Sequence, residues 1–133
     1  MNRRFAIIGI VIFAGMLYLT TYAHEAGHAL MCQLAGFESK IIIQQYTFET
    51  RLTLCSERPA DPYWYWAMGG IMGMLSATIP LVAFRKHVVV VIATTPHILA
   101  NAITGTMETF VNEWYRTEAH TAALIASLTM LCV

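Results

Sequence analysis

The feature that most constrains this chain is a set of long stretches without charged side chains. Residues 5–23 and 63–84 carry no charge, and residues 88–111 carry only Glu108. Each stretch is close to the roughly 20 residues that an α-helix needs to cross the hydrocarbon core of a bilayer. The chain of 133 residues is 57% hydrophobic and 12% charged, an apolar excess that a soluble domain of this size cannot bury. We therefore expect an all-α, multi-pass integral membrane protein.

The expected organisation is a single membrane-embedded core that covers the whole chain, residues 1–133. A spanning helix needs about 20 apolar residues, so a shorter apolar stretch at the end of the sequence counts only as a partial helix. The core then has three to four transmembrane helices. Its spans are expected at about 5–35, 63–84 and 88–111, with the partial helix at 120–133.

Basic residues next to the spans indicate how the chain enters the membrane. Arg3 and Arg4 precede the first span. A cleaved signal peptide is the rival interpretation there, but no small-residue cleavage site follows the apolar stretch. Arg85 and Lys86 stand between the second and third spans, on the same side as Arg3 and Arg4. The positive-inside rule then predicts a cytoplasmic N-terminus.

The segment between the first two spans has the alternation of a β-strand. Its side chains alternate between two faces from residue 48 to residue 55. This pattern predicts a short membrane-associated strand or hairpin with one apolar face. The apolar face is expected to carry Phe48, Thr50, Leu52 and Leu54, and the other face Glu49, Arg51, Thr53 and Cys55.

Charge and cysteine usage exclude other classes of protein. The formal net charge is zero and no run of Lys or Arg is present, so we expect no nucleic-acid partner. The three cysteines, Cys32, Cys55 and Cys132, are odd in number and lack Cys-x-x-Cys spacing. This spacing indicates neither a disulfide framework nor a thiolate zinc site, and we expect free thiols.

The motif that carries chemistry is HEAGH at residues 24–28, where the first span ends. His24 and His28 lie one helical turn apart, so both imidazoles can bind one metal ion. Catalytic zinc takes three protein ligands and a water whose pKa falls to about 7, and a carboxylate that is not a ligand can accept its proton. Zn²⁺ is therefore the predicted cofactor and Glu25 the predicted catalytic base. The alternative is that the motif arises by chance and the histidines merely satisfy a helix end, but ionisable groups that continue an apolar span normally mark a function.

The third span offers candidates for the third ligand on one helical face. They are spaced by four, three and four residues, which places them on one stripe. His97 is the better metal ligand by residue type, and Asn101 can bind the substrate by a hydrogen bond to its backbone or to a developing oxyanion. Both can instead stabilise contacts between helices. The stripe comprises His97, Asn101, Thr104 and Glu108.

Depth in the membrane chooses among these candidates. The first and third spans run in the same direction, so equal distances from their starts mean equal depths. The midpoint of HEAGH lies about 21 residues beyond Phe5. Glu108 lies about 20 residues beyond Val88, whereas His97 lies about 9 beyond it, roughly 17 Å short. Glu108 is therefore the preferred third metal ligand and His97 the alternative.

HEAGH at the end of a first membrane span resembles the site-2 protease family of intramembrane zinc metallopeptidases. The strand-like segment, Gly69-Gly70 in the second span, and Asn101 followed by an acid in the third are also similar to features of that family. The sequence departs from the family pattern because Glu108-Thr109 stands where an Asp-Gly pair is expected. The resemblance covers roughly Tyr18 to Glu108.

The resemblance implies an intramembrane zinc metalloendopeptidase that cleaves membrane-protein substrates within the lipid bilayer. Its strand near residues 48–54 offers an edge on which an unwound substrate can pair by main-chain hydrogen bonds. The alternative is a non-enzymatic metal- or haem-binding membrane protein, or an inactive partner subunit. Glu25 between the two histidines favours catalysis, because a haem or transport site needs no base there.

Overall fold

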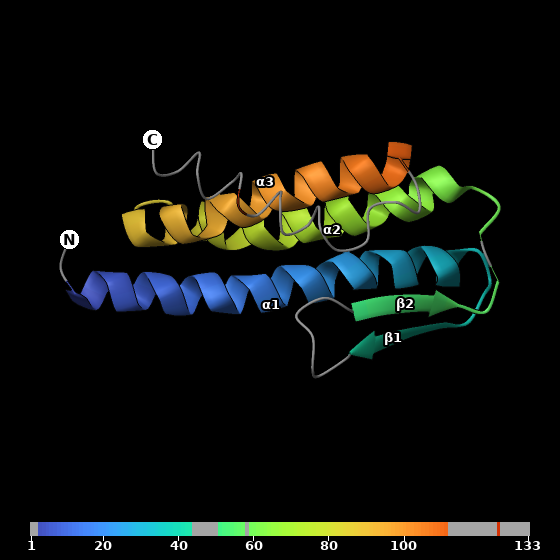
Figure 1. Cartoon of the computed structure of the whole chain (residues 1–133), viewed down its shortest axis with the longest axis horizontal. Coiled ribbons are helices and arrows are strands. Elements are labelled where there is room, and N and C mark those ends of the chain that lie inside the picture. Colours follow the sequence, from blue (N-terminus) through green and yellow to red (C-terminus); the bar gives the residue numbers. More distant parts are fainter. Residues whose placement is uncertain (1–2, 44–50, 58, 112–124, 126–133) are drawn as a thin grey trace.

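The computed structural model describes residues 3–43, 51–57, 59–111 and residue 125. Three helices lie side by side, and a two-stranded hairpin packs against the C-terminal part of the first helix (Figure 1). This is the predicted arrangement of helices with a hairpin between the first two, and the helix bounds agree with the predicted spans to within two residues. The elements are α1 (Arg3–Leu34), β1 (Ser39–Ile43), β2 (Arg51–Cys55), α2 (Pro62–Ala83) and α3 (Val88–Val111).

Two parts of the sequence prediction lie outside the described residues. Phe48, Glu49 and Thr50 of the predicted strand fall in the undescribed segment 44–50. Of the predicted partial helix at 120–133, only residue 125 is described.

The C-terminus of α1 is stopped by a glycine that reverses the chain toward β1. Gly36 has a φ of 82°, a left-handed conformation that L side chains rarely adopt. Its N–H donates to the Gln33 carbonyl (3.0 Å), and the Phe37 N–H donates to the Cys32 carbonyl (2.9 Å). These two bonds form a Schellman motif, which satisfies carbonyls that the ending helix leaves unpaired. The turn returns the chain alongside the last turns of α1.

The N-terminus of α2 carries its own start signal. Asp61 is the N-cap, and its carboxylate accepts hydrogen bonds from the backbone N–H groups of Tyr63 (3.1 Å) and Trp64 (3.4 Å). Pro62 occupies the first helical position, where a missing N–H costs nothing. This cap sets the starting point of α2 beside the C-terminal part of α1.

The hairpin is antiparallel, with Ile41 of β1 opposite Thr53 of β2. Thr53 is 6% exposed, whereas the neighbouring Leu54 is 46% exposed. The buried face of β2 is therefore the one predicted to be polar, because the Thr53 side chain bonds to a residue of α1. Leu54, on the predicted apolar face, points away from the helices.

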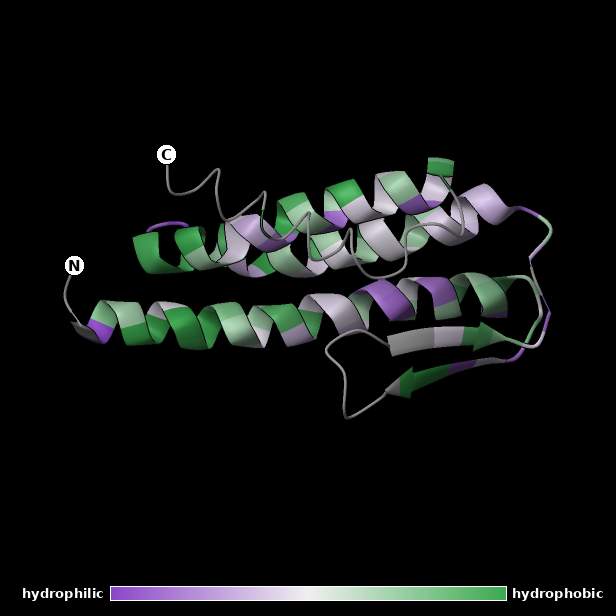
Figure 2. Cartoon of the chain, in the orientation of Figure 1, coloured by the Kyte–Doolittle hydropathy of each residue, from purple (hydrophilic) through white to green (hydrophobic). Residues whose placement is uncertain are grey.

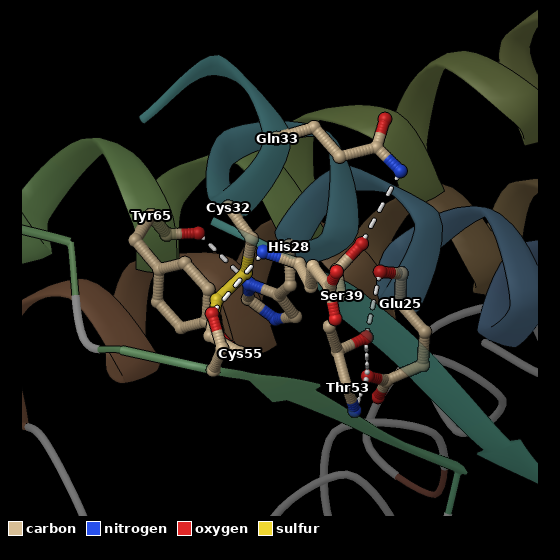
Figure 3. The surroundings of a disulfide bond; sticks show 10 residues. Glu25, His28, Cys32, Gln33, Ser39, Thr53, Cys55 and Tyr65 are labelled. Atoms are coloured by element: carbon tan, nitrogen blue, oxygen red, sulfur yellow. Dashed lines mark hydrogen bonds between the residues drawn. A yellow bond between two sulfur atoms is a disulfide. The ribbon is translucent and has the colours of Figure 1, made fainter. Parts of the chain in front are cut away.

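The cysteines correct one sequence prediction. Cys32 of α1 and Cys55 of β2 form a disulfide (Figure 3), whereas both were expected as free thiols. The two residues are 23 positions apart, and only the reversal after α1 brings their Cα atoms to 5.8 Å. No spacing signature in the sequence carries that information.

Glycines allow the helices to approach closely. A Cβ added at Gly105 of α3 would meet the Cα of Gly70 in α2, and one added at Gly27 of α1 would meet the Met68 carbonyl of α2. Gly70, a member of the Gly69-Gly70 pair singled out from the sequence, makes this backbone contact between α2 and α3. Small residues are what permit such contacts between helices in a membrane.

The distribution of polarity is inverted relative to a soluble protein. All three helices are long and apolar enough to cross a membrane. Large apolar side chains on their outer surfaces are open, as at Ile10 (68% exposed), Ile79 (68%) and Phe110 (75%). Figure 2 shows apolar residues along most of α1 and a hydrophilic stretch in its C-terminal part. The polar helical residues that are buried instead are Thr20, His24, His28, Thr94, His97, Asn101 and Thr104.

Candidate metal centre

Two histidines of α1 and one glutamate of α3 converge at one point. The Nε2 atoms of His24 and His28 lie 3.1 Å apart. The Glu108 Oε2 lies 3.0 Å from the His24 Nε2 and 3.6 Å from the His28 Nε2. Both histidines are buried, and the Glu108 side chain is 19% exposed. The structure thus brings together the three residues that the sequence analysis named as metal ligands, and this group can hold a metal ion.

The separations of the three atoms suit a tetrahedral ion. Nitrogen and oxygen ligands bound to zinc at about 2.0–2.1 Å lie roughly 3.3–3.4 Å from one another at tetrahedral angles. The observed separations of 3.0, 3.1 and 3.6 Å bracket that value. The Glu108 Oε2 is buried, and neither of its contacts with the two imidazole rings has the angles of a hydrogen bond. Its lone pairs therefore fit a shared cation better than a donor on either ring.

A main-chain carbonyl of α2 sets the tautomer of His28. The Nδ1 atom of His28 lies 2.8 Å from the Tyr65 carbonyl oxygen (Figure 3). A carbonyl can only accept, so Nδ1 carries the proton and the lone pair of a neutral ring is on Nε2, the atom that faces Glu108. Sequence reasoning missed Tyr65, because a backbone oxygen leaves no residue-type signal.

Gly69 of α2 leaves room for both imidazole rings. A Cβ added at this position would overlap the His28 Nε2 and lie 2.8 Å from the His24 Nε2. The sequence predicted close helix packing at Gly69 from its Gly69-x-x-x-Gly73 spacing, but not a role beside the histidines. Its site role is to let α2 pass directly beside the ligand atoms.

The other members of the polar stripe on α3 lie outside the ligand group. His97 is 1% exposed and packs against Phe13, with 4.5 Å between ring centroids. Phe13 precedes His24 by 11 residues, or about 16 Å along α1. His97, the alternative third ligand, thus lies closer to the N-terminal end of α1 than the metal-binding group does. This agrees with the difference in depth predicted from the sequence.

Asn101 lies between His97 and the ligand group. It is 1% exposed, and its Nδ2 donates to the His97 carbonyl oxygen at 2.8 Å. Gly73 of α2 leaves the space that its Oδ1 occupies. Neither the Asn101 Oδ1 nor the His24 Nδ1 has a hydrogen-bond partner among the described residues. Contact between Asn101 and a substrate stays a prediction.

The Glu25 carboxylate is hydrogen-bonded to the hairpin. Its Oε2 accepts hydrogen bonds from the Thr53 N–H (2.9 Å) and from the Thr53 hydroxyl (2.8 Å) (Figure 3). A carboxylate that is not a ligand therefore stands next to His24 in the chain and is held from another element. Thr53 was predicted only as a polar strand residue, and its role depends on where the hairpin packs.

Comparisons with known proteins add no relative. No family model, curated protein or solved structure matches this chain. The resemblance to the site-2 proteases is carried by the sequence motifs alone, and the function has to be argued from the geometry of the site.

Glu108 and His97 make opposite predictions for metal content. Replacement of Glu108 by Ala removes one of three ligand atoms and should lower the zinc bound by the purified protein at least about tenfold. Replacement of His97 by Gln should leave one zinc per chain, because His97 lies outside the group. Elemental analysis of both variants in detergent measures this, and loss of zinc in the His97 variant alone would move the third ligand to His97.

Gly69 should be required for metal binding without contacting the metal. In Gly69→Ala the new methyl group displaces the two imidazole rings, and we expect zinc occupancy to fall at least about tenfold while helical circular dichroism is kept. Gly15→Ala is the matched control, because a Cβ at Gly15 meets nothing within 4 Å. Full zinc occupancy in Gly69→Ala would show that the rings have room to move.

Proposed function

We propose that this protein is an intramembrane zinc metalloendopeptidase that hydrolyses peptide bonds in or near transmembrane segments of membrane-protein substrates. The observation that carries the proposal is the convergence of His24, His28 and Glu108 beside a glutamate that is not a ligand. Three protein ligands and an open fourth position are the usual arrangement of catalytic zinc, whereas structural zinc sites are closed by four protein ligands.

The chemistry divides between the ligands and Glu25. When bound, zinc supplies the Lewis acidity that activates a water molecule and polarises the scissile carbonyl. The Glu25 carboxylate accepts a proton from the attacking water and passes it to the amide nitrogen of the leaving segment. His24, His28 and Glu108 hold their positions, because each comes from a helix packed through glycine contacts.

A membrane location is supported by the inverted polarity of the bundle. Apolar side chains cover the outside of the helices, and polar residues such as Thr20, His24 and Asn101 are buried inside, as expected in lipid. Helix α1 has 32 residues, or about 48 Å, and exceeds a hydrocarbon core of about 30 Å. If the hydrocarbon region of the bilayer begins at Arg4, its opposite boundary falls about 20 residues further along α1, at His24. The site thus lies where lipid meets water, and hydrolysis needs both substrate helix and water.

The haem alternative is disfavoured by the geometry of the histidines. Two axial ligands of a haem stand on opposite sides of the iron, with the macrocycle between them. Here the two Nε2 atoms lie 3.1 Å apart, and the Glu108 Oε2 lies 3.0 Å from one and 3.6 Å from the other. No macrocycle fits between atoms at these separations.

The disulfide and the basic residues support one orientation. Disulfides persist in oxidising compartments and are rare in the cytosol. Cys32 and Cys55 lie at one end of the bundle, and the N-terminus and the turn between α2 and α3 lie at the other (Figure 1). That other end carries Arg3, Arg4, Arg85 and Lys86. We therefore propose that the N-terminus is cytoplasmic and that the metal centre faces the oxidising side of the membrane.

Glu25→Gln is the sharpest test of the enzymatic role. The amide cannot accept a proton, so peptide hydrolysis should fall by about 10²- to 10⁴-fold while one zinc per chain is retained. The assay is the appearance of new termini, by mass spectrometry, in single-span membrane proteins reconstituted with the enzyme in vesicles. Glu38→Gln changes an exposed glutamate of the same chain and is the control. Full hydrolysis by Glu25→Gln would refute the proposed mechanism.

Thiol labelling tests the orientation. Cells are lysed in the presence of an alkylating maleimide, and the protein is denatured so that every free thiol can react. Without a reducing agent only Cys132 should be labelled. After reduction, Cys32 and Cys55 should be labelled as well. The count is read as the number of mass-tagged maleimides per chain. Three tags without reduction would place the hairpin end in a reducing compartment and overturn the proposed orientation.

A further inference from the structure

The carboxylate of Glu25 is held from outside its own helix by a single residue of the hairpin. The Thr53 N–H donates to the Glu25 Oε2 at 2.9 Å, and the Thr53 hydroxyl lies 2.8 Å from the same oxygen. The hydroxyl also lies 2.8 Å from the main-chain carbonyl oxygen of Glu25. Thr53 is 6% exposed, so these bonds are made away from bulk solvent.

The bonds from Thr53 restrict the base in a way that suits its proposed task. A glutamate side chain has several rotatable bonds, and most of its rotamers would turn the carboxylate away from an attacking water. The Thr53 N–H holds Oε2 in place, and the Thr53 hydroxyl lies within bonding distance of the same oxygen. Within the described part of the chain, Oε1 has no hydrogen-bond partner and is the oxygen left to accept a proton.

The hydroxyl and the N–H of Thr53 have separate roles. A hydroxyl has one proton and can donate to only one acceptor at a time, either the Glu25 Oε2 or the Glu25 carbonyl. The main-chain N–H keeps Oε2 engaged in either case. When the hydroxyl donates to Oε2, it supplies a second bond that restricts rotation of the carboxylate about the first.

The hairpin is fastened to α1 close to Thr53. Cys55 lies two residues further along β2, on the same face of the strand, and is joined to Cys32, which follows His28 by one helical turn. Ser56 adds two bonds to Glu38, one from its N–H to the Glu38 carbonyl (2.9 Å) and one from the Glu38 N–H to its Oγ (3.1 Å). The disulfide at Cys55 thus restrains Thr53, two residues away, in its position beside Glu25.

We propose that Thr53 is a positioning residue that orients the Glu25 carboxylate for proton transfer. This rests on the proposed function, since it takes Glu25 as the base. The inference also changes the role expected of the strand. A substrate strand added to β2 would need the Thr53 N–H as a donor, but that N–H is engaged by Glu25. At this position the hairpin serves the base and not the substrate.

Two substitutions separate the hydroxyl from the shape of the side chain. Thr53→Val keeps the branched shape and the main-chain N–H but removes the hydroxyl, and we expect kcat to fall about 10- to 100-fold with KM changed by less than about twofold. Thr53→Ser keeps the hydroxyl and should restore kcat to within about threefold of the parent. Leu54→Val alters the exposed neighbour on the same strand and should leave both constants unchanged.

Zinc content and maleimide uptake of each variant report whether the fold survives. One zinc per chain and a protected Cys32–Cys55 pair in Thr53→Val, with a reduced kcat and rescue by Ser, support the positioning role. Loss of zinc or of the disulfide in Thr53→Val would assign Thr53 to the fold and overturn the proposal, as would full activity. If Glu25→Gln is inactive while Thr53→Val is fully active, only the role of Thr53 fails. If Glu25→Gln is fully active, the proposed function itself fails.

Discussion

The meeting of two imidazole nitrogens with a carboxylate oxygen inside an apolar bundle is the constraint on which the structure depends. A buried carboxylate is costly unless an opposite charge or a metal compensates it, and the cost rises in a membrane. The Glu108 Oε2 is buried against His24 and His28 of a different helix, so α3 must lie beside α1 with residue 108 at the level of the two histidines. The connection through α2 meets that requirement, because two reversals restore the original direction.

Each element contributes a different part of the site. Helix α1 carries two of the proposed metal ligands and the proposed base, and α3 carries the third proposed ligand. Helix α2 contributes no ligand side chain, but its Tyr65 carbonyl sets the tautomer of His28 and its Gly69 leaves space for the rings. The hairpin, joined to α1 by a disulfide, holds the carboxylate of Glu25. The ligands and the base are thus fixed by separate contacts, which allows the base to be oriented without distorting the ligands.

The position of the site along the bundle is as informative as its composition. It lies near the end of the bundle that carries the hairpin, far from the start of α1 and the turn between α2 and α3 (Figure 1). In the proposed membrane location, the site lies at the boundary of the hydrocarbon region, where water can reach it. In the proposed function, a substrate segment reaches this boundary from the lipid, and cleavage occurs where its end emerges.

The sequence by itself determined what depends on local periodicity and length. Uncharged stretches of spanning length located the helices, a separation of four residues placed His24 and His28 on one face, and the constant rise of a helix chose Glu108 over His97 by depth. The tertiary structure alone decided which groups meet across elements. The disulfide between Cys32 and Cys55, the Tyr65 carbonyl, the ring space at Gly69 and the bonds of Thr53 to Glu25 all join distant segments. They could not be predicted, because main-chain atoms, absent side chains and pairs of distant residues leave no periodic pattern in a single sequence.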